Sequence, residues 1–234
     1  MQEKLADGLS HVTDWVFDLD NTLYPRDCDL FAQIDVKMTE YVGNLLGLDP
    51  VAARKVQKEL YRDYGTTLHG LMEQYQIDPH EFIDHVHDID YSALEPNQEL
   101  GLLIAALPGR KHIFTNADQG HAERTLEKLG ITTHFDHIFD IIAADMIPKP
   151  DFRTYETFIG AHGVDAERAV MFEDMPRNLD VPKDMGMATV LVLPQEGSRF
   201  AAEAWEHSIN EEEAIDFTTR DITRFLSQVV EAID

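Results

Sequence analysis

Residues 14–22 read DWVFDLDNT, and this segment is the most informative part of the sequence about the fold. Its residues 15–17 have the bulk and the β-propensity of a buried strand, yet the strand ends in two acids, Asp18 and Asp20. Ionised carboxylates are costly to bury unless a cation or hydrogen-bond donors meet them. Because strand side chains alternate, both acids can point the same way from the carboxyl end, where open α/β sheets bind ligands. The pair therefore predicts a site for a hard divalent cation with oxygen ligands.

Four more apolar segments have the character of core strands. They are residues 112–114, 138–143, 169–172 and 189–193. Helical patterns separate them, and Gly130 and Gly163 stand where two of these helices would end. Strands that alternate with helices are typical of a doubly wound parallel sheet, so the predicted fold class is α/β.

The interval after the first strand is too long for one crossover helix. Residues 27–92 are helical in pattern, and Asp49-Pro50 and Asp78-Pro79 are two helix starts. A helical insertion directly after the first strand predicts a cap domain at residues 25–94. The remaining residues, 1–24 and 95–234, would form a Rossmann-like catalytic core, which an amphipathic helix closes near its end.

Composition narrows the class of protein. The 234 residues carry 44 acids against 19 bases, a net charge of −25, which argues against nucleic-acid partners and against docking on anionic membranes. Cys28 is the only cysteine, so no internal disulfide forms and a reducing compartment is expected. Residues 1–11 are polar and no run reaches the length of a membrane span, so we expect a cytoplasmic protein. The oligomeric state stays open.

Polar side chains follow each predicted strand at the edge where Asp18 lies. Thr115 and Asn116 follow the second strand, Lys149 lies beyond the third, and Glu173 and Asp174 end the fourth. Acids that can hold a metal ion, with a hydroxyl and an ammonium group that can bind phosphate oxygens, indicate a phosphoryl-transfer site.

These residues resemble the four motifs of the haloacid dehalogenase (HAD) superfamily, over residues 12–26 and 95–195. Further stretches are similar to the pyrimidine 5′-nucleotidase branch of that superfamily. They are DLDNTLYP at 18–25, YGTTLHGL at 64–71, HDIDYSALEP at 87–96, FTNADQGHAERTL at 114–126 and FEDMPRNL at 172–179. Because they cover cap and core, they also carry information on the substrate.

The resemblance implies a division of labour among the catalytic residues. Asp18 would attack phosphorus and become an aspartyl-phosphate, and Asp20 would act as general acid and then general base. Thr115 and Lys149 would bind the phosphoryl oxygens, and Lys149 would also keep Asp18 ionised, since a nearby cation lowers the pKa of a carboxylate.

The resemblance also implies a Mg²⁺ site. The ligands would be a carboxylate oxygen of Asp18, the backbone carbonyl of Asp20 and the carboxylate of Asp174, although Mn²⁺ suits the same oxygens. Glu173 would act on this site through water or Lys149. Asn178 stands where many members of the superfamily place a second acid, so it adds no charge there.

Residues of the cap and its neighbouring loops are expected to select the substrate. The candidates are Tyr24, Tyr64, Thr66, Thr67, His69 and Asn116, with Arg153 as a further one. Either tyrosine could stack on a base, and Thr66, Thr67 or His69 could hydrogen-bond to it. Each also has a plain structural alternative, as a core aromatic residue, a helix cap or a surface histidine.

We therefore expect a Mg²⁺-dependent phosphatase that acts on a small phosphorylated metabolite, with a pyrimidine nucleoside 5′-monophosphate as the leading substrate. The alternatives are a phosphatase or phosphomutase for a sugar phosphate, phosphoglycolate or pyridoxal phosphate, a 2-haloacid dehalogenase, and a non-catalytic phospho-ligand binding protein. Two other patterns are discounted. The acids from Asp88 to Glu99 lack the glycine of a calcium loop, and His80, His85 and His87 are taken as a solvated helix face.

Overall fold

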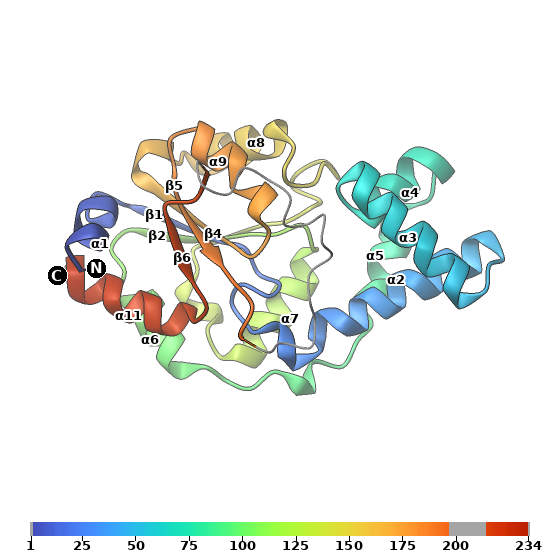
Figure 1. Ribbon diagram of the computed structural model, residues 1–234, viewed down its shortest axis with the longest axis horizontal. Coiled ribbons are helices and arrows are strands. Elements are labelled where there is room, and N and C mark those ends of the chain that lie inside the picture. Colours follow the sequence, from blue (N-terminus) through green and yellow to red (C-terminus); the bar gives the residue numbers. More distant parts are fainter. Residues whose placement is uncertain (1, 197–213, 234) are drawn as a thin grey trace.

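The computed structural model describes residues 2–196 and 214–233. Its parallel sheet has the strand order β3-β2-β1-β4-β5-β6 (Figure 1). The strands are β1 (Asp14–Phe17), β2 (Arg110–Phe114), β3 (His137–Phe139), β4 (Ala169–Glu173), β5 (Ala188–Val192) and β6 (Phe217–Thr219). The chain winds outward from β1 to β3 and then returns to β4 on the other side of β1. The sheet is therefore doubly wound, with its switch point beside β1, and the predicted fold class is confirmed.

Helices cover both faces of the sheet. One face carries α1 (Gln2–Leu9), α6 (Gln98–Ala106), α7 (Gln119–Leu129) and α11 (Ile222–Ile233), and the other carries α8 (Phe152–His162) and α9 (Asp180–Asp184) (Figure 1). Because strand side chains alternate, Trp15 and Phe17 enter the core under the first layer and Val16 enters the core under the second. The two layers bury β1 on both sides, and this position fixes the acids that follow it.

Four further helices lie beyond the carboxyl edge of the sheet, at the right of Figure 1. They are α2 (Leu30–Leu46), α3 (Pro50–Tyr64), α4 (Thr67–Tyr75) and α5 (Pro79–Val86), and they share a hydrophobic core with Ile141. The predicted N-caps are confirmed, because the Asp49 side chain accepts hydrogen bonds from Val51 N and Ala52 N, and that of Asp78 from His80 N. Residues 25–94 remain our proposal for the extent of the cap.

Short 3₁₀ helices connect these elements. Those in the described ranges are η1 (Arg26–Cys28), η2 (Tyr91–Ala93), η3 (Thr132–His134), η4 (Ala166–Arg168) and η5 (Pro176–Asn178). Within residues 2–196 and 214–233, no helix is both long and apolar enough to cross a membrane.

The third strand is shorter than the sequence predicts. It ends at Phe139 rather than at residue 143. Asp140 turns the chain, because its Oδ1 accepts a hydrogen bond from Ala143 N at 2.8 Å and its Oδ2 accepts one from Gln119 N at 2.9 Å. The apolar run from 138 to 143 therefore leaves the sheet, and Ile141 packs against the helices beyond it.

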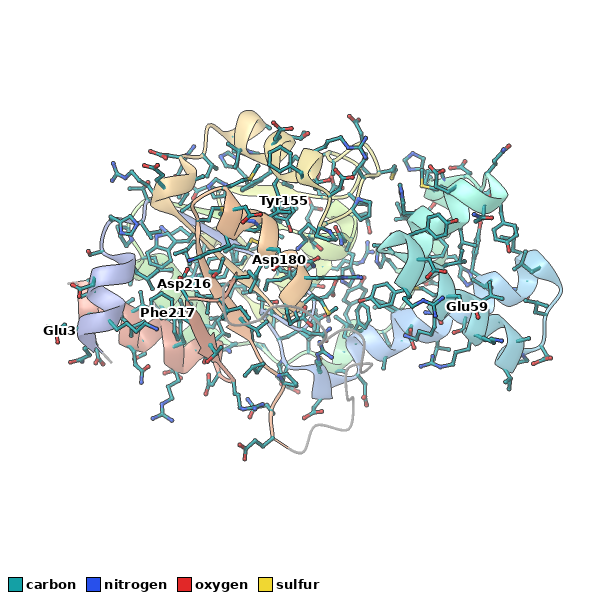
Figure 2. The ribbon with its side chains drawn as sticks, turned by 45° about the horizontal axis from the view of Figure 1, so that its top comes forward. Glu3, Glu59, Tyr155, Asp180, Asp216 and Phe217 are labelled. Carbon is teal, nitrogen blue, oxygen red and sulfur yellow. The ribbon has the colours of Figure 1, made fainter. Side chains whose placement is uncertain are left out.

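The sixth strand is absent from the sequence prediction, because its three residues are too few to show a pattern. Phe217 begins it at the edge of the sheet and Asp216 directly precedes it, both labelled in Figure 2. Asp216 accepts hydrogen bonds from Lys183 Nζ at 2.5 Å and from Thr189 N at 3.0 Å. These contacts tie the edge strand to α9 and β5.

Candidate active site

The ammonium group of Lys149 joins three strand ends. Asp18 follows β1, and its backbone N donates a hydrogen bond to Phe172 O, so it lies level with Glu173 at the end of β4. Lys149 Nζ donates to Asp18 Oδ1 at 2.8 Å, to Glu173 Oε2 at 2.7 Å and to Phe114 O at 2.8 Å. All three residues with charged side chains are buried, so a protonated lysine compensates carboxylates that have lost most of their contact with water.

The loop after β2 fixes the backbone of Lys149. Asn116 Oδ1 accepts a hydrogen bond from Lys149 N at 2.8 Å, and Asn116 Nδ2 donates to Lys149 O at 3.3 Å. Thr115 Oγ1 accepts one from Ala117 N at 3.0 Å. The adjacent residues Thr115 and Asn116 and the sequence-distant Lys149 therefore form one corner of the site.

Three carboxylates meet beside this lysine. One oxygen from each of Asp18, Glu173 and Asp174 lies within 4.8 Å of the others, and Asp174 also accepts a 2.7 Å hydrogen bond from Arg26. Burial and the charge of Glu173 raise the pKa of Asp18 to about 7. Burial, with the charge of Asp18 acting against that of Arg26, raises the pKa of Asp174 to about 6. The cluster holds more negative charge than the two bases compensate, so it can accept a metal ion.

The electrostatics correct one expectation. Lys149 does lower the pKa of Asp18, but burial and Glu173 outweigh it, so the lysine alone does not keep Asp18 ionised. In contrast, although burial opposes it, Asp18 and Glu173 raise the pKa of Lys149, which stays charged.

Asp20 is held by residues outside its own motif. Its Oδ1 accepts hydrogen bonds from Tyr24 OH and from His121 Nε2, the latter at 2.9 Å. With Nε2 donating to the carboxylate, His121 Nδ1 is the acceptor for Tyr91 OH at 2.9 Å. Burial opposes ionisation of Asp20, but His121 and Tyr24 together lower its pKa. The prediction from sequence missed His121 and Tyr91. The only sign of them in the sequence is that they lie within residues 114–126 and 87–96, two of the stretches that resemble the pyrimidine 5′-nucleotidase branch.

One discounted histidine belongs to this neighbourhood. The His87 side chain is only 8% exposed, so the interpretation as a solvated helix face is wrong for it. Its ring stacks on that of His121 at 4.5 Å between centroids, and its Nδ1 lies 2.5 Å from Asp118 Oδ1. Burial lowers the pKa of His87 despite this carboxylate, and the stacked ring leaves His121 little freedom to turn.

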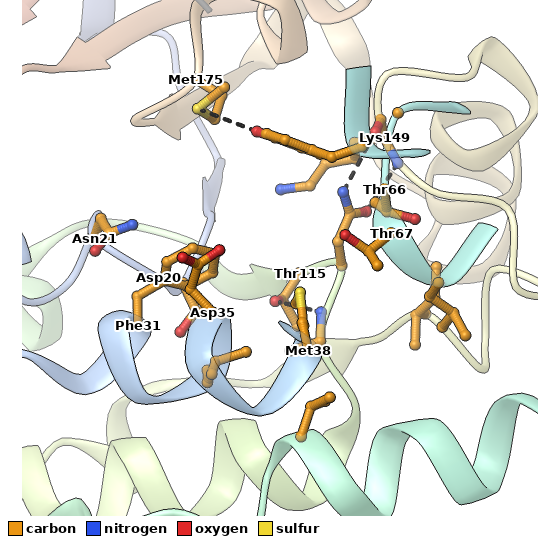
Figure 3. Close-up of a pocket in the computed structure, with 18 of the residues that line it drawn as sticks. Asp20, Asn21, Phe31, Asp35, Met38, Thr66, Thr67, Thr115, Lys149 and Met175 are labelled. Carbon is orange, nitrogen blue, oxygen red and sulfur yellow. Dashed lines mark hydrogen bonds between the residues drawn. The ribbon is translucent and has the colours of Figure 1, made fainter. Parts of the chain in front are cut away.

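A cavity of about 660 Å³ lies between the carboxyl edge of the sheet and the helices α2 and α3 (Figure 3). Its floor includes Asp18, Asp20, Asn21, Thr115, Asn116, Lys149, Glu173, Asp174 and Asn178. Asp35 and Met38 of α2 face this floor across the cavity (Figure 3). The cavity therefore lies between the acids of the floor and the helices α2 and α3.

Charged and polar groups organise the opposite wall. Asp35 accepts hydrogen bonds from Arg54 Nη1 at 2.6 Å, Gln57 Nε2 at 2.7 Å and Lys58 Nζ at 2.9 Å. Tyr61 is the fifth residue of this wall, and Lys58 Nζ lies over its ring, 5.8 Å from the ring centroid. The sequence analysis missed all five, because a polar helix face that lines a cavity has the same pattern as one that faces water.

The structure separates the predicted substrate residues into two groups. Thr66, Thr67 and Asn116 line the cavity, whereas Tyr24, Tyr64, His69 and Arg153 are not among its lining residues. Tyr24 is 3% exposed with its hydroxyl on Asp20, and the hydroxyl of Tyr64 accepts a hydrogen bond from Gln74, so neither ring is placed to stack on a base there. Thr66, Thr67 and Asn116 are therefore the predicted residues that can contact a ligand in this cavity.

The remaining predicted residues lie around Lys149. Glu173 contacts it directly and also accepts a hydrogen bond from Met175 N at 3.2 Å, so it acts on the lysine itself. Asn178 is buried on the cavity floor, and within the described ranges its Oδ1 has no hydrogen-bond partner. That oxygen is available to a water molecule or a ligand in the cavity.

Residues 16–186 match the family model of the haloacid dehalogenase-like hydrolases. The chain belongs to this family. Phosphate metabolism protein 8 of Saccharomyces cerevisiae is 30% identical over 195 residues, which are 76% of this chain and 60% of that protein. This chain thus spans about 60% of the length of that relative.

Solved structures of HAD enzymes share the fold. The L-2-haloacid dehalogenase of Xanthobacter autotrophicus is similar with a TM-score of 0.59 and 15% identity, over 93% of this chain and 98% of that one. A HAD phosphatase from Thermococcus onnurineus gives 0.58 and 16%, over 92% and 97%. At such identities the likeness shows the architecture alone, so the chemistry must be argued from the site of this HAD hydrolase.

Proposed function

We propose that this HAD hydrolase is a Mg²⁺-dependent phosphatase of small phosphomonoesters, with pyrimidine nucleoside 5′-monophosphates as its preferred substrates. The observation that carries the proposal is the bridge from Lys149 Nζ to Asp18 and Glu173. It holds a nucleophilic carboxylate and a phosphate-binding cation together, beside a metal-binding acid, Asp174, at one end of the cavity.

The first step forms a bond from a carboxylate oxygen of Asp18 to phosphorus and breaks the bond to the leaving oxygen. Asp20, when protonated, gives its proton to that oxygen. In the second step water attacks the aspartyl-phosphate, Asp20 takes the proton of the water, and phosphate leaves Asp18. Because His121 and Tyr24 lower the pKa of Asp20, the observed arrangement is the ionised form that serves as base in this second step.

Hydrogen-bonding groups on the floor bind the phosphoryl group. Thr115 Oγ1 lines the cavity beside Asp18 and can donate a hydrogen bond to one phosphoryl oxygen. Lys149 Nζ supplies positive charge there and can bind a second phosphoryl oxygen in exchange for one of its three present acceptors. Asn116 keeps the lysine in place through two backbone hydrogen bonds. This fixed geometry favours the in-line attack, because the groups need little rearrangement as charge develops.

The acidic cluster fits Mg²⁺. The carboxylates of Asp18 and Asp174 and the backbone carbonyl of Asp20 would hold it, which matches the preference of this ion for oxygen ligands. Burial, together with the neighbouring carboxylates, raises the pKa of Asp18 and of Asp174, and a bound cation would stabilise their ionised forms. When bound, the ion supplies positive charge to the phosphoryl oxygens and lowers the pKa of the nucleophile.

The wall formed by α2 and α3 supports a nucleotide-sized substrate. The cavity volume, about 660 Å³, lies in the range of small-molecule sites. Thr66 and the Asp35 cluster supply hydroxyl, carboxylate and cationic groups, which can pair with the amide-like edge of a pyrimidine and with ribose hydroxyls. The similarity of residues 64–71 and 87–96 to the pyrimidine 5′-nucleotidase branch favours this substrate class over other phosphoesters.

Dehalogenation is disfavoured by the same geometry. That reaction attacks carbon, uses no metal ion and needs no second acid beside the nucleophile. Here two hydrogen-bond donors hold Asp20, and Glu173 and Asp174 form part of a buried acidic cluster. Burying such carboxylates in their ionised form costs free energy unless a cation binds beside them. A phosphomutase would keep the same core, and only the choice of acceptor would distinguish it.

The test is phosphate release from a panel of esters with Mg²⁺ or with EDTA, and with Asp18→Asn as the control. The panel holds UMP, CMP, AMP, phosphoglycolate, pyridoxal phosphate and hexose phosphates. We expect metal-dependent release that is fastest on UMP and CMP, and a loss of at least about a hundredfold in Asp18→Asn. Turnover of other esters alone would retain the phosphatase and reject the nucleotidase, whereas turnover in Asp18→Asn above about a hundredth of the wild-type rate would reject Asp18 as the nucleophile.

A further inference from the structure

A cluster of three histidines lies away from the active site. His112 is on β2, His137 begins β3, and His162 ends α8. The parallel register places His112 beside His137, and the His112 ring also contacts Phe158 of α8, so the cluster lies on the face of the sheet that α8 covers. One ring nitrogen of each histidine lies within 4.8 Å of one ring nitrogen of each of the others.

The innermost histidine has an unused nitrogen. His112 is fully buried, and its Nε2 lies 2.9 Å from Asp14 Oδ1, a carboxylate that Arg110 also contacts at 2.7 Å. Because the carboxylate can only accept, Nε2 carries the hydrogen and Nδ1 has the lone pair. Within residues 2–196 and 214–233, Nδ1 of His112 is buried and has no hydrogen-bond partner. A buried polar atom of this kind needs a partner to compensate its lost hydration.

We propose that His112, His137 and His162 bind one divalent transition-metal ion of the Zn²⁺ type, with Nδ1 of His112 as the innermost ligand. Three imidazoles suit Zn²⁺, and a water molecule can complete four-coordination on the exposed side of His137. Asp14 accepts a hydrogen bond from Nε2 of His112, and an outer carboxylate commonly orients a metal-binding histidine through its second ring nitrogen in this way.

The surroundings allow the three rings to converge. His137 is exposed and His162 is partly exposed, so their rings can turn about χ2 without displacing the core. At present these two rings stack at 4.6 Å between centroids. Burial lowers the pKa of His112 and, with the neighbouring His137, lowers that of His162 to about 4, so both are in the neutral form that binds metals.

The ion would have a structural effect. It would add a further link between β2, the edge strand β3 and the carboxyl end of α8, beside the β2–β3 ladder and the hydrogen bonds that Arg110 donates to the carbonyl oxygens of His162 and Gly163. The two metal sites would also select different ions, because the cluster around Asp18 offers oxygen ligands and this one offers nitrogen ligands.

The experiment is calorimetric titration of the metal-free full chain with Zn²⁺, with Mg²⁺ kept at saturation so that the acidic cluster is occupied. We expect one Zn²⁺ per chain and a higher Tm with Zn²⁺. His137→Ala and His162→Ala should each weaken binding at least about tenfold and abolish the Tm increase. His11→Ala, which removes an exposed histidine outside the cluster, should bind as the wild type does.

Absorption of Co²⁺ in the visible range gives a second measurement, since tetrahedral nitrogen coordination is distinct from the octahedral hydrated ion. Circular dichroism checks that each variant is folded. If the wild type binds no Zn²⁺, or if both histidine variants bind it as tightly as the wild type, the proposal is wrong. The readout is metal binding, so the outcome is independent of whether the enzyme hydrolyses phosphoesters.

Discussion

His121 Nε2 lies 2.9 Å from Oδ1 of Asp20. This contact joins the second acid of the first motif to a helix more than a hundred residues away. The other nitrogen of His121 meets Tyr91, in the segment that returns from the cap helices to the core. The position of the proposed general acid thus depends on residues of the core and of the cap connection together.

Removing the His121 contact should raise the pKa of Asp20 but also leave its carboxyl group free to turn away from the leaving oxygen, so protonation of the leaving group should be impaired. For His121→Leu we expect kcat/KM to fall about 30-fold or more on alkyl phosphates such as nucleotides. The loss should be much smaller on p-nitrophenyl phosphate, whose leaving group needs little protonation. Phosphate release measured on both substrates gives this comparison.

His121→Gln is the matched variant, because its amide nitrogen can replace Nε2, and it should recover part of the activity. A purely structural role for His121 would instead lower both substrates equally and lower the Tm. Equal losses on the two esters in a folded His121→Leu variant would therefore contradict a positioning role.

Metal binding should weaken as the pH falls below 7. The pKa values of Asp18 and Asp174 are about 7 and about 6 in the metal-free protein, so protons compete with Mg²⁺ for the same oxygens below these values. Above pH 7 both acids are ionised and the affinity should level off. Between pH 7 and 5 the apparent Kd should rise, by up to about tenfold per pH unit for each proton displaced.

Calorimetric titration of Mg²⁺ at pH 5, 6, 7 and 8 measures this dependence, and uptake of protons by the buffer gives the number released. Lys149→Met removes the buried cation and should raise the pKa of Asp18 further, which moves the dependence to higher pH. An affinity that does not change between pH 5 and 8 would show that these acids are not the ligands.

The wall around Asp35 should determine substrate preference. Burial opposes ionisation of Asp35, but Arg54, Lys58 and Gln57 together lower its pKa, so it organises these groups as a carboxylate. For Asp35→Asn we expect KM for nucleoside monophosphates to rise about tenfold, with little change on p-nitrophenyl phosphate and no change in Mg²⁺ affinity. Asp63→Asn on the neighbouring helix α3, where the side chain is exposed, is the control. Uniform losses on all esters would argue against a role in specificity.

Gly109 should be needed for stability at the start of β2. Its φ is +78°, and a Cβ there would lie 2.2 Å from the carbonyl oxygen of Thr13, which also accepts the backbone hydrogen bond of Arg110 at 2.8 Å. Gly109→Ala should therefore lower the free energy of unfolding by about 2 kcal/mol or more. Gly160, inside α8, has nothing within 4 Å of such a Cβ, so Gly160→Ala should raise it by about 0.5–1 kcal/mol. Chemical denaturation of both variants tests the contrast.

Much of the fold was predictable from local sequence. The apolar run before Asp18 defines the central strand, and the Asp-Pro pairs at residues 49–50 and 78–79 define two helix starts, since caps and strand burial act over a few residues. The apolar run at 138–143 misled the prediction, because a side-chain hydrogen bond from Asp140 ends the strand early. The edge strand β6 was too short to show a period.

The catalytic groups on the floor of the cavity could be predicted from the sequence alone. Asp18, Asp20, Thr115, Lys149 and Asp174 each follow a strand or its loop, and parallel strands must bring their carboxyl ends to one edge. That placement follows from topology, so the predicted residues do meet in the structure.

The other side chains that contact or face these floor residues could be identified only from the tertiary structure. Tyr24 turned to Asp20 instead of the substrate cavity, while His121, Asp35 and Lys58 arrived from helices whose polar faces look like solvent-facing ones in sequence. The physical reason is that a helix pattern gives which face is apolar, whereas the partner of the polar face depends on how the helices pack across the sheet.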